Sequence, residues 1–419
     1  MRCDEPSGEV LLPVEPDHEY VGLIFVPRVL RARVFGGHKD AWSYHRRSWS
    51  VKATGLQIAL MRQGAAGILP AQREVVSMSV VKFEHVGVAA IAEMRAPRAM
   101  SSAEIESRLE SAMARAGLPP GLIYQLTGIA ERRVWPPGVL ASVPAAMAGR
   151  KALERSDVSR ERIGVLVSTS VCKDYIEPSV ASMVHRTLEL GSHCLNFDVG
   201  NACLGFLNGV MIVGDMIERG SIEFGMIVDG ESSLEVIEAT IARLNEPGFP
   251  VEKMREQLAT LTLGSGAAAM VLGRRELLND GAPQVIGAVT EAATEHNDLC
   301  RGQRDWMETD AAMLLVRGVE LGQRTFARAQ AELGWSPGAL DLVCAHQVSA
   351  VHMTRVAEAL GLSMDRFLKI YHDHGNVGPA SIPIALAKAV DQGRVGPGAR
   401  VGLMGIGSGL NASMMEIRF

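Results

Sequence analysis

Paired cysteines are missing from this chain of 419 residues, although it contains six cysteines. They are scattered, and none forms a Cys-x-x-Cys pair, which argues against a disulfide framework and against a zinc site. No uncharged apolar run reaches the roughly 18 residues of a membrane-spanning helix. The first nine residues lack a basic-then-apolar signal pattern. The net charge of −5 gives no overall attraction to nucleic acid or anionic lipid. These absences predict a cytoplasmic globular protein without bound metal.

The first 77 residues differ from the rest of the chain. Segments such as "HKDAWSYHRRSW" show neither helical nor strand periodicity. We expect residues 1–77 to be a poorly ordered N-terminal extension, or the product of a start codon assigned too early; a small accessory domain is the alternative. From Met78 onward the pattern is α/β. Its first helix is predicted over 101–118, with Ser101 as the N-cap and Glu104 three residues later.

Two halves of the α/β region share one pattern. A strand leads through a polar turn and a helix to a second strand that ends in a Gly/Ser turn. The first strands are "RIGVLVSTSV" (162–171) and "ALDLVCAHQVS" (339–349), and the second are "EFGMIVDGESS" (223–233) and "ARVGLMGIGSG" (399–409). We therefore predict an internal duplication, with one half at 78–275 and the other at 276–419.

Cys203 stands where a buried-looking strand gives way to a helix, in "FDVGNACLGF". We expect it in the first turn of that helix. Unpaired N–H groups at a helix N-terminus favour the thiolate, and this would lower the pKa of the thiol. Cys203 is therefore a candidate nucleophile. The alternative is a buried structural cysteine.

Two more polar side chains are predicted at the ends of secondary-structure elements. His346 follows an apolar strand in "VCAHQVS", and Asn376 follows Gly375, just before a helix that starts near Pro379. Cysteine, histidine and asparagine together suit acyl transfer, in which a thiolate attacks and N–H donors stabilise the developing oxyanion. The alternatives are a satisfied core histidine and a turn asparagine. His372 and His374 flank Asp373, and we interpret these histidines as polar residues of a loop and not as a metal site.

Four segments in order carry a family resemblance: "DVGNACLGF", "HQVS", "HGNVGPASIP" and "GIGSGLN". They resemble the thiolase-fold condensing enzymes of the 3-oxoacyl-ACP synthase III type, over residues 78–419. The resemblance implies a duplicated βαβαβαββ unit in a five-layer αβαβα arrangement. "STSVCKDYIEPSVASMVH", "TLGSGAAAMV" and "EHNDLCRGQRDWMETD" further resemble OleA, the branch that condenses two long-chain acyl-CoAs head to head without decarboxylation.

The resemblance implies roles for five residues. Cys203 would be acylated by the first acyl-CoA, and His346 with Asn376 would hold the thioester oxygen of the second. Glu177 would enter the partner subunit's active site as the base, which implies a homodimer. The backbone N–H of Cys203, with one from about Ser408, would form the oxyanion hole. Coenzyme A would serve as the substrate carrier, and no other cofactor is expected.

Glu177 separates two kinds of condensing enzyme. A synthase that removes CO2 from a malonyl group needs no carboxylate base. A non-decarboxylating Claisen condensation must remove a proton from the carbon α to a thioester. A carboxyl group desolvated in an apolar site has a raised pKa, which suits that task. The alternative for Glu177 is an acidic residue near the N-terminus of the helix "PSVASMVHRTL", where negative charge is favoured.

The leading prediction is therefore an acyltransferase that makes a 2-alkyl-3-ketoalkanoic acid for downstream olefin or β-lactone pathway enzymes. The alternative is a decarboxylating 3-oxoacyl-ACP synthase III, which uses acyl-CoA and malonyl-ACP. A non-catalytic subunit that shapes a partner's tunnel is a third hypothesis. Such subunits usually lose the nucleophile, whereas Cys203 is present here.

Overall fold

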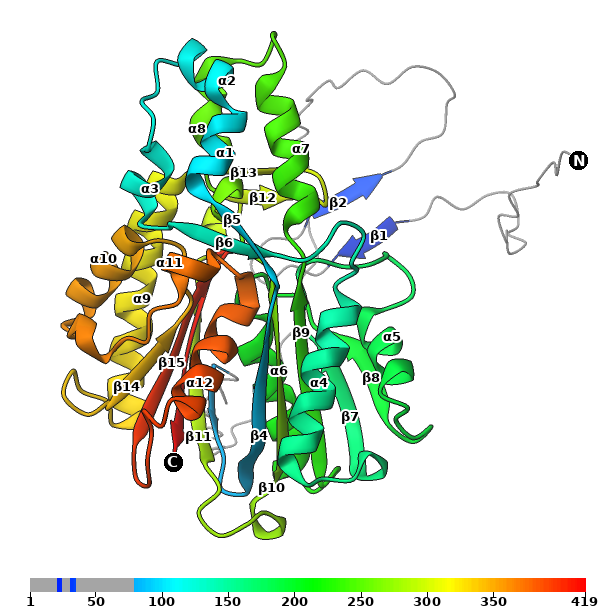
Figure 1. Cartoon of the computed structure of the whole chain (residues 1–419). Coiled ribbons are helices and arrows are strands. Elements are labelled where there is room, and N and C mark those ends of the chain that lie inside the picture. Colours follow the sequence, from blue (N-terminus) through cyan, green and yellow to red (C-terminus); the bar gives the residue numbers. More distant parts are fainter. Residues whose placement is uncertain (1–20, 25–30, 35–78) are drawn as a thin grey trace, which may run out of the picture. The chain divides into compact units, whose positions relative to one another are not determined.

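The computed structural model describes residues 21–24, 31–34 and 79–419 (Figure 1). The chain divides into two units, residues 1–72 and residues 73–419. In the first unit, strands β1 (Val21–Ile24) and β2 (Arg31–Val34) pair antiparallel. The predictions made for residues 1–77 otherwise concern residues outside the described part of the chain.

The second unit is built on a ten-stranded sheet with the order β14-β15-β16-β11-β4-β10-β9-β7-β8, in which β3 also pairs with β11. Its strands are β3 (Val80–Lys82), β4 (Val86–Arg95), β7 (Ile163–Ser168), β8 (Leu195–Asp198), β9 (Phe224–Glu231), β10 (Gly266–Arg274), β11 (Gln284–Ala292), β14 (Leu342–Ala345), β15 (Arg400–Gly407) and β16 (Asn411–Arg418). Two smaller sheets pair β5 (Arg98–Ser101) with β6 (Glu131–Val134) and β12 (Cys300–Gly302) with β13 (Met307–Thr309).

The strand order repeats across the large sheet. In the first half, β7 is parallel to β8 and β9, while β10 is antiparallel to β9 and β4. In the second half, β14 is parallel to β15, while β16 is antiparallel to β15 and β11. The counterpart of β8 is reduced to one parallel bridge between Val343 and Phe367. The predicted duplication is confirmed, with β7 corresponding to β14 and β9 to β15. The boundaries 78–275 and 276–419 stay a prediction.

The helices form three layers around the two halves of the sheet. Helices α6 (Gly205–Glu218) and α12 (Ser381–Asp391) contribute to one hydrophobic core together with strands of both halves. Helices α4 (Ser142–Ser156) and α5 (Val180–Thr187) pack on the first half, and α9 (Ala311–Leu333) and α10 (Ala350–Leu360) on the second (Figure 1). The result is the predicted αβαβα arrangement.

A group of helices beyond one end of the sheet has its own hydrophobic core. It comprises α1 (Ser102–Arg108), α2 (Glu110–Arg115), α3 (Leu122–Thr127), α7 (Leu234–Asn245) and α8 (Met254–Gln257), while the short α11 (Tyr371–His374) lies nearer the sheet. Ser101 caps α1 as predicted, because its hydroxyl accepts a hydrogen bond from the Glu104 N–H at 2.9 Å. The single helix predicted over 101–118 is wrong. Leu109 leaves the helical backbone (φ −107°, ψ 9°) and is buried in this core.

Candidate active site

Cys203 lies in the turn between β8 and α6. The helix begins at Gly205 with Leu204 as its N-cap, so Cys203 precedes the first turn in which it was predicted. Ala202 has a φ of 43°, a left-handed conformation that is uncommon outside glycine. Gly407 at the end of β15 approaches this turn closely, since a Cβ added there would lie 3.3 Å from the Cys203 nitrogen. The structure thus presents the cysteine at the N-terminal end of a central helix.

Burial raises the pKa of the Cys203 thiol to about 12, and nearby Cys300 and Glu231 act in the same direction. A backbone hydrogen bond at Cys203 lowers the pKa but does not offset burial. The expectation of a lowered pKa is therefore wrong, because the loss of solvation by the surrounding chain outweighs the helix N-terminus. The thiol is protonated at neutral pH, so its attack on an acyl group must coincide with loss of the proton.

Alkylation of Cys203 by iodoacetamide is therefore expected to be slow at pH 7. The rate should rise by about tenfold per pH unit toward pH 10, because only the thiolate reacts and its fraction grows tenfold per unit below the pKa. Mass spectrometry of the Cys203 peptide over a pH series measures this rate. Free cysteine provides the control, since its rate levels off near its own pKa of about 8.5. A Cys203 rate that levels off below pH 8 would contradict the raised pKa.

The structure brings His346 and Asn376 together at the backbone of Gly378. His346 follows β14, is buried, and donates its backbone N–H to the Met404 carbonyl at 2.8 Å. Burial lowers the pKa of His346 to about 3, with nearby His352 acting in the same direction and a hydrogen bond to the Gly378 backbone opposing them. The imidazole is therefore neutral near pH 7.

Asn376 is held by its backbone and by its side-chain oxygen. Its N–H donates to the Thr262 carbonyl at 2.9 Å, and its carbonyl accepts from the Gly264 N–H at 2.8 Å. The side-chain Oδ1 accepts from the Gly378 N–H at 3.0 Å. Because Oδ1 is occupied in this way, the amide Nδ2 remains as the group that can donate to a substrate oxygen.

Gln347, which follows His346 directly in "HQVS", supports this site. Its side chain is buried; Nε2 donates to the Leu368 carbonyl at 2.7 Å, and Oε1 accepts from the N–H groups of Ile370 and Tyr371. The segment that leads to Asn376 is therefore fixed beside His346. A polar side chain directly after an apolar strand was the available sequence signal.

Glu177 lies on the loop between β7 and α5. It is exposed, and no hydrogen bond or ion pair joins it to another described residue. The alternative role of Glu177, as an acidic group at the N-terminus of α5, is performed by other side chains. The Ser179 hydroxyl accepts from the Ser182 N–H, and the Asp198 carboxylate accepts from the N–H groups of Val180 and Ala181. The carboxylate of Glu177 is therefore available to another molecule.

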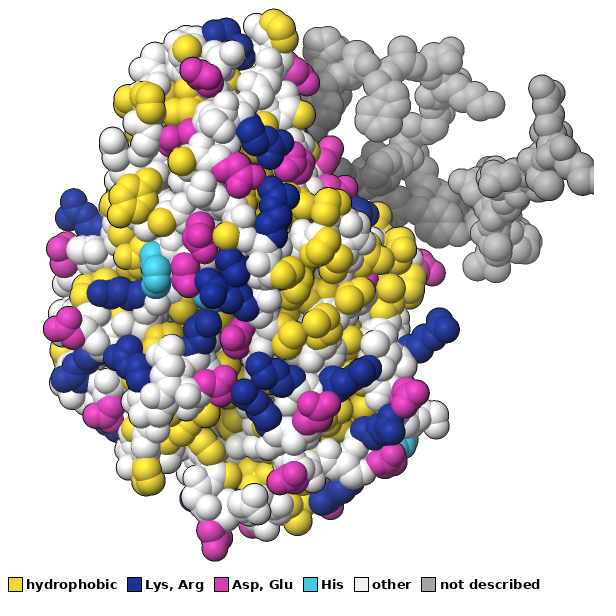
Figure 2. All heavy atoms as spheres, viewed as in Figure 1, with side chains coloured by type: hydrophobic (Ala, Val, Ile, Leu, Met, Phe, Trp, Pro, Cys, Tyr) yellow, Lys and Arg dark blue, Asp and Glu magenta, His cyan; other side chains and the backbone are white. Residues whose placement is uncertain are grey.

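Exposed apolar side chains surround this loop. Ile176 next to Glu177 is 103% exposed. Other large hydrophobic side chains exposed on the loop, on α4 and on β8 are Val143, Met147, Val171, Tyr175 and Leu195. Figure 2 shows hydrophobic side chains gathered over α4 and toward α5. We call these six residues the α4-loop patch. Contiguous exposed apolar surface of this kind marks contact sites.

Ser408 occupies the turn between β15 and β16, directly after Gly407. The close approach of Gly407 to Cys203 brings this turn beside the nucleophile. This placement suits the oxyanion-hole role predicted for the backbone N–H groups of Cys203 and Ser408, which stays a prediction.

Two buried carboxyl groups, Asp229 and Glu231, were not singled out from the sequence. Both lie on β9, a strand buried at every position. Glu231 Oε1 accepts from the Val171 N–H at 2.6 Å, and Oε2 from the Cys172 N–H at 3.2 Å. Asp229 Oδ2 accepts from the Thr169 hydroxyl at 2.5 Å. Two acidic residues two positions apart in an apolar strand were the signal that could have revealed them, because such groups are rarely buried unpaired.

Burial raises the pKa of Glu231 to about 7, although hydrogen bonds from the Cys172 thiol, the Val171 and Cys172 N–H groups and Asp229 oppose it. Burial also raises the pKa of Asp229 well above its usual range, and the neighbouring Glu231 adds to this shift. Asp229 therefore retains its proton near neutral pH. The pair lies close enough to Cys203 to raise the pKa of its thiol.

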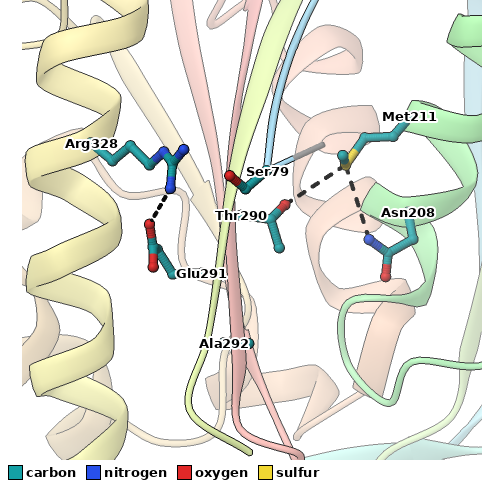
Figure 3. Close-up of a pocket in the computed structure, with 7 residues that line it drawn as sticks. All are labelled: Ser79, Asn208, Met211, Thr290, Glu291, Ala292 and Arg328. Carbon is teal, nitrogen blue, oxygen red and sulfur yellow. Dashed lines mark hydrogen bonds and ion pairs between the residues drawn. The ribbon is translucent and has the colours of Figure 1, made fainter. Parts of the chain in front are cut away.

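A cavity of about 420 Å³ is lined by residues of α6, β11 and α9 and by Ser79 (Figure 3). Asn208 and Met211 project into it from α6 and Thr290 from β11, while Arg328 on α9 pairs with Glu291 at 2.6 Å. The Asn208 Oδ1 accepts from the Asn201 Nδ2 at 2.7 Å, which connects the cavity wall to the turn of Cys203. Its volume is within the range of small-molecule sites.

Within residues 79–419, no group of three or more His, Cys, Asp or Glu side chains could hold a metal ion. None of the helices in the described part of the chain is long and apolar enough to cross a bilayer.

The duplicated five-layer fold places a cysteine and a His–Asn pair at the ends of elements from its two halves, as in condensing enzymes of the thiolase superfamily. Residues 330–419 match the family model "3-Oxoacyl-[acyl-carrier-protein (ACP)] synthase III C terminal". Within that superfamily, the chain belongs to the OleA family of acyl-CoA:acyl-CoA alkyltransferases. A relative with that name from Xanthomonas campestris is 45% identical over 335 residues, covering 80% of this chain and 99% of the relative. One from Shewanella oneidensis is 36% identical, covering 81% and 100%.

Solved structures agree with this assignment. The cerulenin-bound OleA of Xanthomonas campestris superposes with a TM-score of 0.79 at 44% identity, covering 81% of this chain and 98% of that chain. A β-ketoacyl-[acyl-carrier-protein] synthase III from Rhizorhabdus wittichii is more distant, at 27% identity over 305 residues, with 71% of this chain and 90% of the relative covered. The predicted family and the predicted enzyme class, an acyltransferase, are confirmed.

Proposed function

We propose that this enzyme joins two long-chain acyl-CoAs by a non-decarboxylative, head-to-head Claisen condensation, and that the product is a 2-alkyl-3-ketoalkanoic acid. The observation that carries the proposal is the exposed carboxylate of Glu177, which pairs with no other described residue and lies on a loop that also exposes Ile176. A decarboxylating synthase needs no such base, whereas abstraction of a proton α to a thioester does. Relatives named acyl-CoA:acyl-CoA alkyltransferase support the same substrates.

In the first step, the Cys203 sulfur attacks the thioester carbonyl carbon of one acyl-CoA. The thiol proton leaves, the bond from that carbon to the CoA sulfur breaks, and CoA departs as a thiol. The backbone N–H groups of Cys203 and Ser408 stabilise the oxyanion of the tetrahedral intermediate. The cavity lined by α6, β11 and α9 offers space for an alkyl chain, and the Asn201–Asn208 hydrogen bond connects it to the Cys203 turn.

In the second step, the side-chain N–H donors of His346 and Asn376 hold the thioester oxygen of the other acyl-CoA. Glu177 from the partner subunit takes the α-proton, and the resulting enolate carbon attacks the acyl group on Cys203. The carbon–sulfur bond to Cys203 breaks, and the cysteine regains a proton. Hydrolysis of the remaining CoA thioester releases the β-keto acid. Coenzyme A is the only carrier required, and no further cofactor takes part.

The enzyme acts as a homodimer in this proposal, because the exposed Glu177 carboxylate has no hydrogen bond or ion pair to another described residue of its own chain and can enter a site in the partner. The α4-loop patch next to Glu177 provides the apolar surface for this contact. The product has a keto group β to its carboxylate, so the next enzymes must reduce or activate it on the way to an olefin or a β-lactone.

Incubation of the purified protein with myristoyl-CoA alone tests the function. We expect CoA release together with a β-keto acid or the ketone formed by its decarboxylation, both identified by mass spectrometry. Retention of one acyl group on Cys203, with turnover only after malonyl-ACP is added, would instead identify a decarboxylating synthase. Absence of any acyl group on Cys203 would favour a non-catalytic subunit.

A further inference from the structure

Glu231 lies between two parts of the chain that have different roles in the proposed mechanism. Glu231 is the last residue of β9 and is only 4% exposed. On one side lies the start of the loop that carries Glu177, and on the other side lies the backbone of Gly378. None of the catalytic steps above uses this residue.

The contact with the loop is made through both carboxylate oxygens. Oε1 accepts from the Val171 N–H and Oε2 from the Cys172 N–H, so two consecutive backbone groups are fixed by one side chain. These residues begin the segment that leads to Glu177. The far end of the segment is fixed separately, by Ser179 and Asp198 at the start of α5. Glu231 therefore determines where the exposed loop leaves the core.

Gly378 faces the Glu231 side chain. A Cβ added to Gly378 would lie 3.8 Å from the Glu231 carboxyl carbon, an ordinary van der Waals distance, and the φ of 54° at this position favours glycine. The Gly378 N–H donates to the Asn376 Oδ1, and the Gly378 backbone lies close enough to His346 to act on the pKa of its imidazole. A shift of Gly378 would therefore displace both groups that hold the second substrate.

We propose that Glu231 is a positioning residue that fixes, at once, the loop that delivers Glu177 to the partner subunit and the Gly378 backbone that orients Asn376 and His346 in its own subunit. This inference rests on the proposed function. One carboxylate then sets the geometry of both sites of the dimer, one directly and one through the loop.

The charge of Glu231 matters for this role. Only an ionised carboxylate offers both oxygens as acceptors to two N–H groups. The titratable groups that face it are Asp229 on the same strand, the Cys172 thiol on the loop and the Cys203 thiol before α6. Because the pKa of Glu231 is raised to about 7, protonation below that pH would cost the loop one acceptor.

The test compares Glu231→Gln with Glu231→Asp and with Glu238→Gln. Glu238 is a half-buried glutamate on α7 that pairs with Arg108, and its substitution serves as the matched control. In Glu231→Gln we expect the single-turnover acylation of Cys203 to stay within about twofold of native, while kcat for condensation falls by about tenfold or more. The acid limb of the kcat–pH profile near pH 7 should disappear. Glu231→Asp should recover part of the rate, and Glu238→Gln should match the native enzyme.

Hydrogen exchange gives a readout that does not depend on activity. The amides of Val171 and Cys172 should exchange faster in Glu231→Gln than in the native protein or in Glu238→Gln, with the core strands unchanged. If the native enzyme made no product from two acyl-CoAs, the proposed function would fail while this exchange result still reported on positioning. Native kcat, an unchanged pH profile and unchanged exchange in Glu231→Gln would overturn the inference.

Hybrid dimers separate the two contacts. In the first hybrid, one subunit carries Glu231→Gln and the other carries Cys203→Ala, so the live site has the altered Gly378 contact but receives Glu177 from an intact loop. In the second hybrid, one subunit carries both substitutions and the other is native, so the live site has an intact Gly378 contact but receives Glu177 from the altered loop. Both should be slower than a native:Cys203→Ala hybrid. A defect in only one of them would contradict the double role.

Discussion

Replacing Cys203 with alanine is expected to remove the acyl-enzyme and to lower turnover by roughly 10⁴- to 10⁶-fold, as the loss of a catalytic nucleophile does elsewhere. The physical reason is that no other sulfur occupies the turn that precedes α6. Cys172 and Cys300 lie on separate segments, and Cys194 and Cys344 are buried in the hydrophobic core. Intact-protein mass spectrometry after incubation with myristoyl-CoA measures acylation directly.

Cys194→Ala is the matched control, since it removes a thiol far from the proposed chemistry while leaving Cys203 in place. It should become acylated like the native protein and lose only the packing of one buried side chain. Stable acylation of the Cys203→Ala protein would assign the nucleophile to another residue and refute the first step of the mechanism.

Replacing Glu177 with glutamine should divide the reaction into its two halves. Acylation of Cys203 needs no base at the α-carbon, so a burst of CoA release should persist. Condensation should then slow by about 10²- to 10⁴-fold, the usual contribution of a general base. Rapid-quench measurement of free CoA and of β-keto product gives both rates. Glu154→Gln on the exposed face of α4 is the control, and it should leave both rates unchanged.

Mixed dimers show which subunit uses Glu177. Pairing a Glu177→Gln subunit with a Cys203→Ala subunit leaves one site with a nucleophile, and that site can obtain a base only from its partner. Condensation should return in this hybrid, although each homodimer is inactive. If the hybrid stayed inactive while a native:Cys203→Ala hybrid was active, the base would act within its own chain.

The fold was largely predictable because its signals are local or repeated. Buried parallel strands such as β7 and β14 appear as continuous apolar runs, and the same run recurs in both halves. Cys203, His346 and Asn376 were recognisable because each stands in the sequence at the predicted start or end of a secondary-structure element. The break at Leu109 was not visible, because a helical pattern continues through it and only tertiary packing against the helices beyond the sheet turns the chain there.

The electrostatics of the site could not be predicted in the same way. The thiol of Cys203 is adjacent to a helix N-terminus in sequence, but its pKa depends on how much protein surrounds it and on Cys300 and Glu231, which come from distant segments. The role of Glu231 likewise depends on contacts with Val171 and Gly378 that span the first and second halves of the fold.

The duplication has a chemical consequence. Cys203 precedes α6 and Asn376 precedes α12, and these two helices form the shared middle layer and follow the third strand position of each half. The two residues thus occupy equivalent corners of a pseudo-twofold framework. In the proposed reaction, one corner holds the carbonyl of the electrophile and the other holds that of the nucleophile. A pseudosymmetric framework would then impose opposite reactivities on two copies of one substrate, because its two corners carry different side chains.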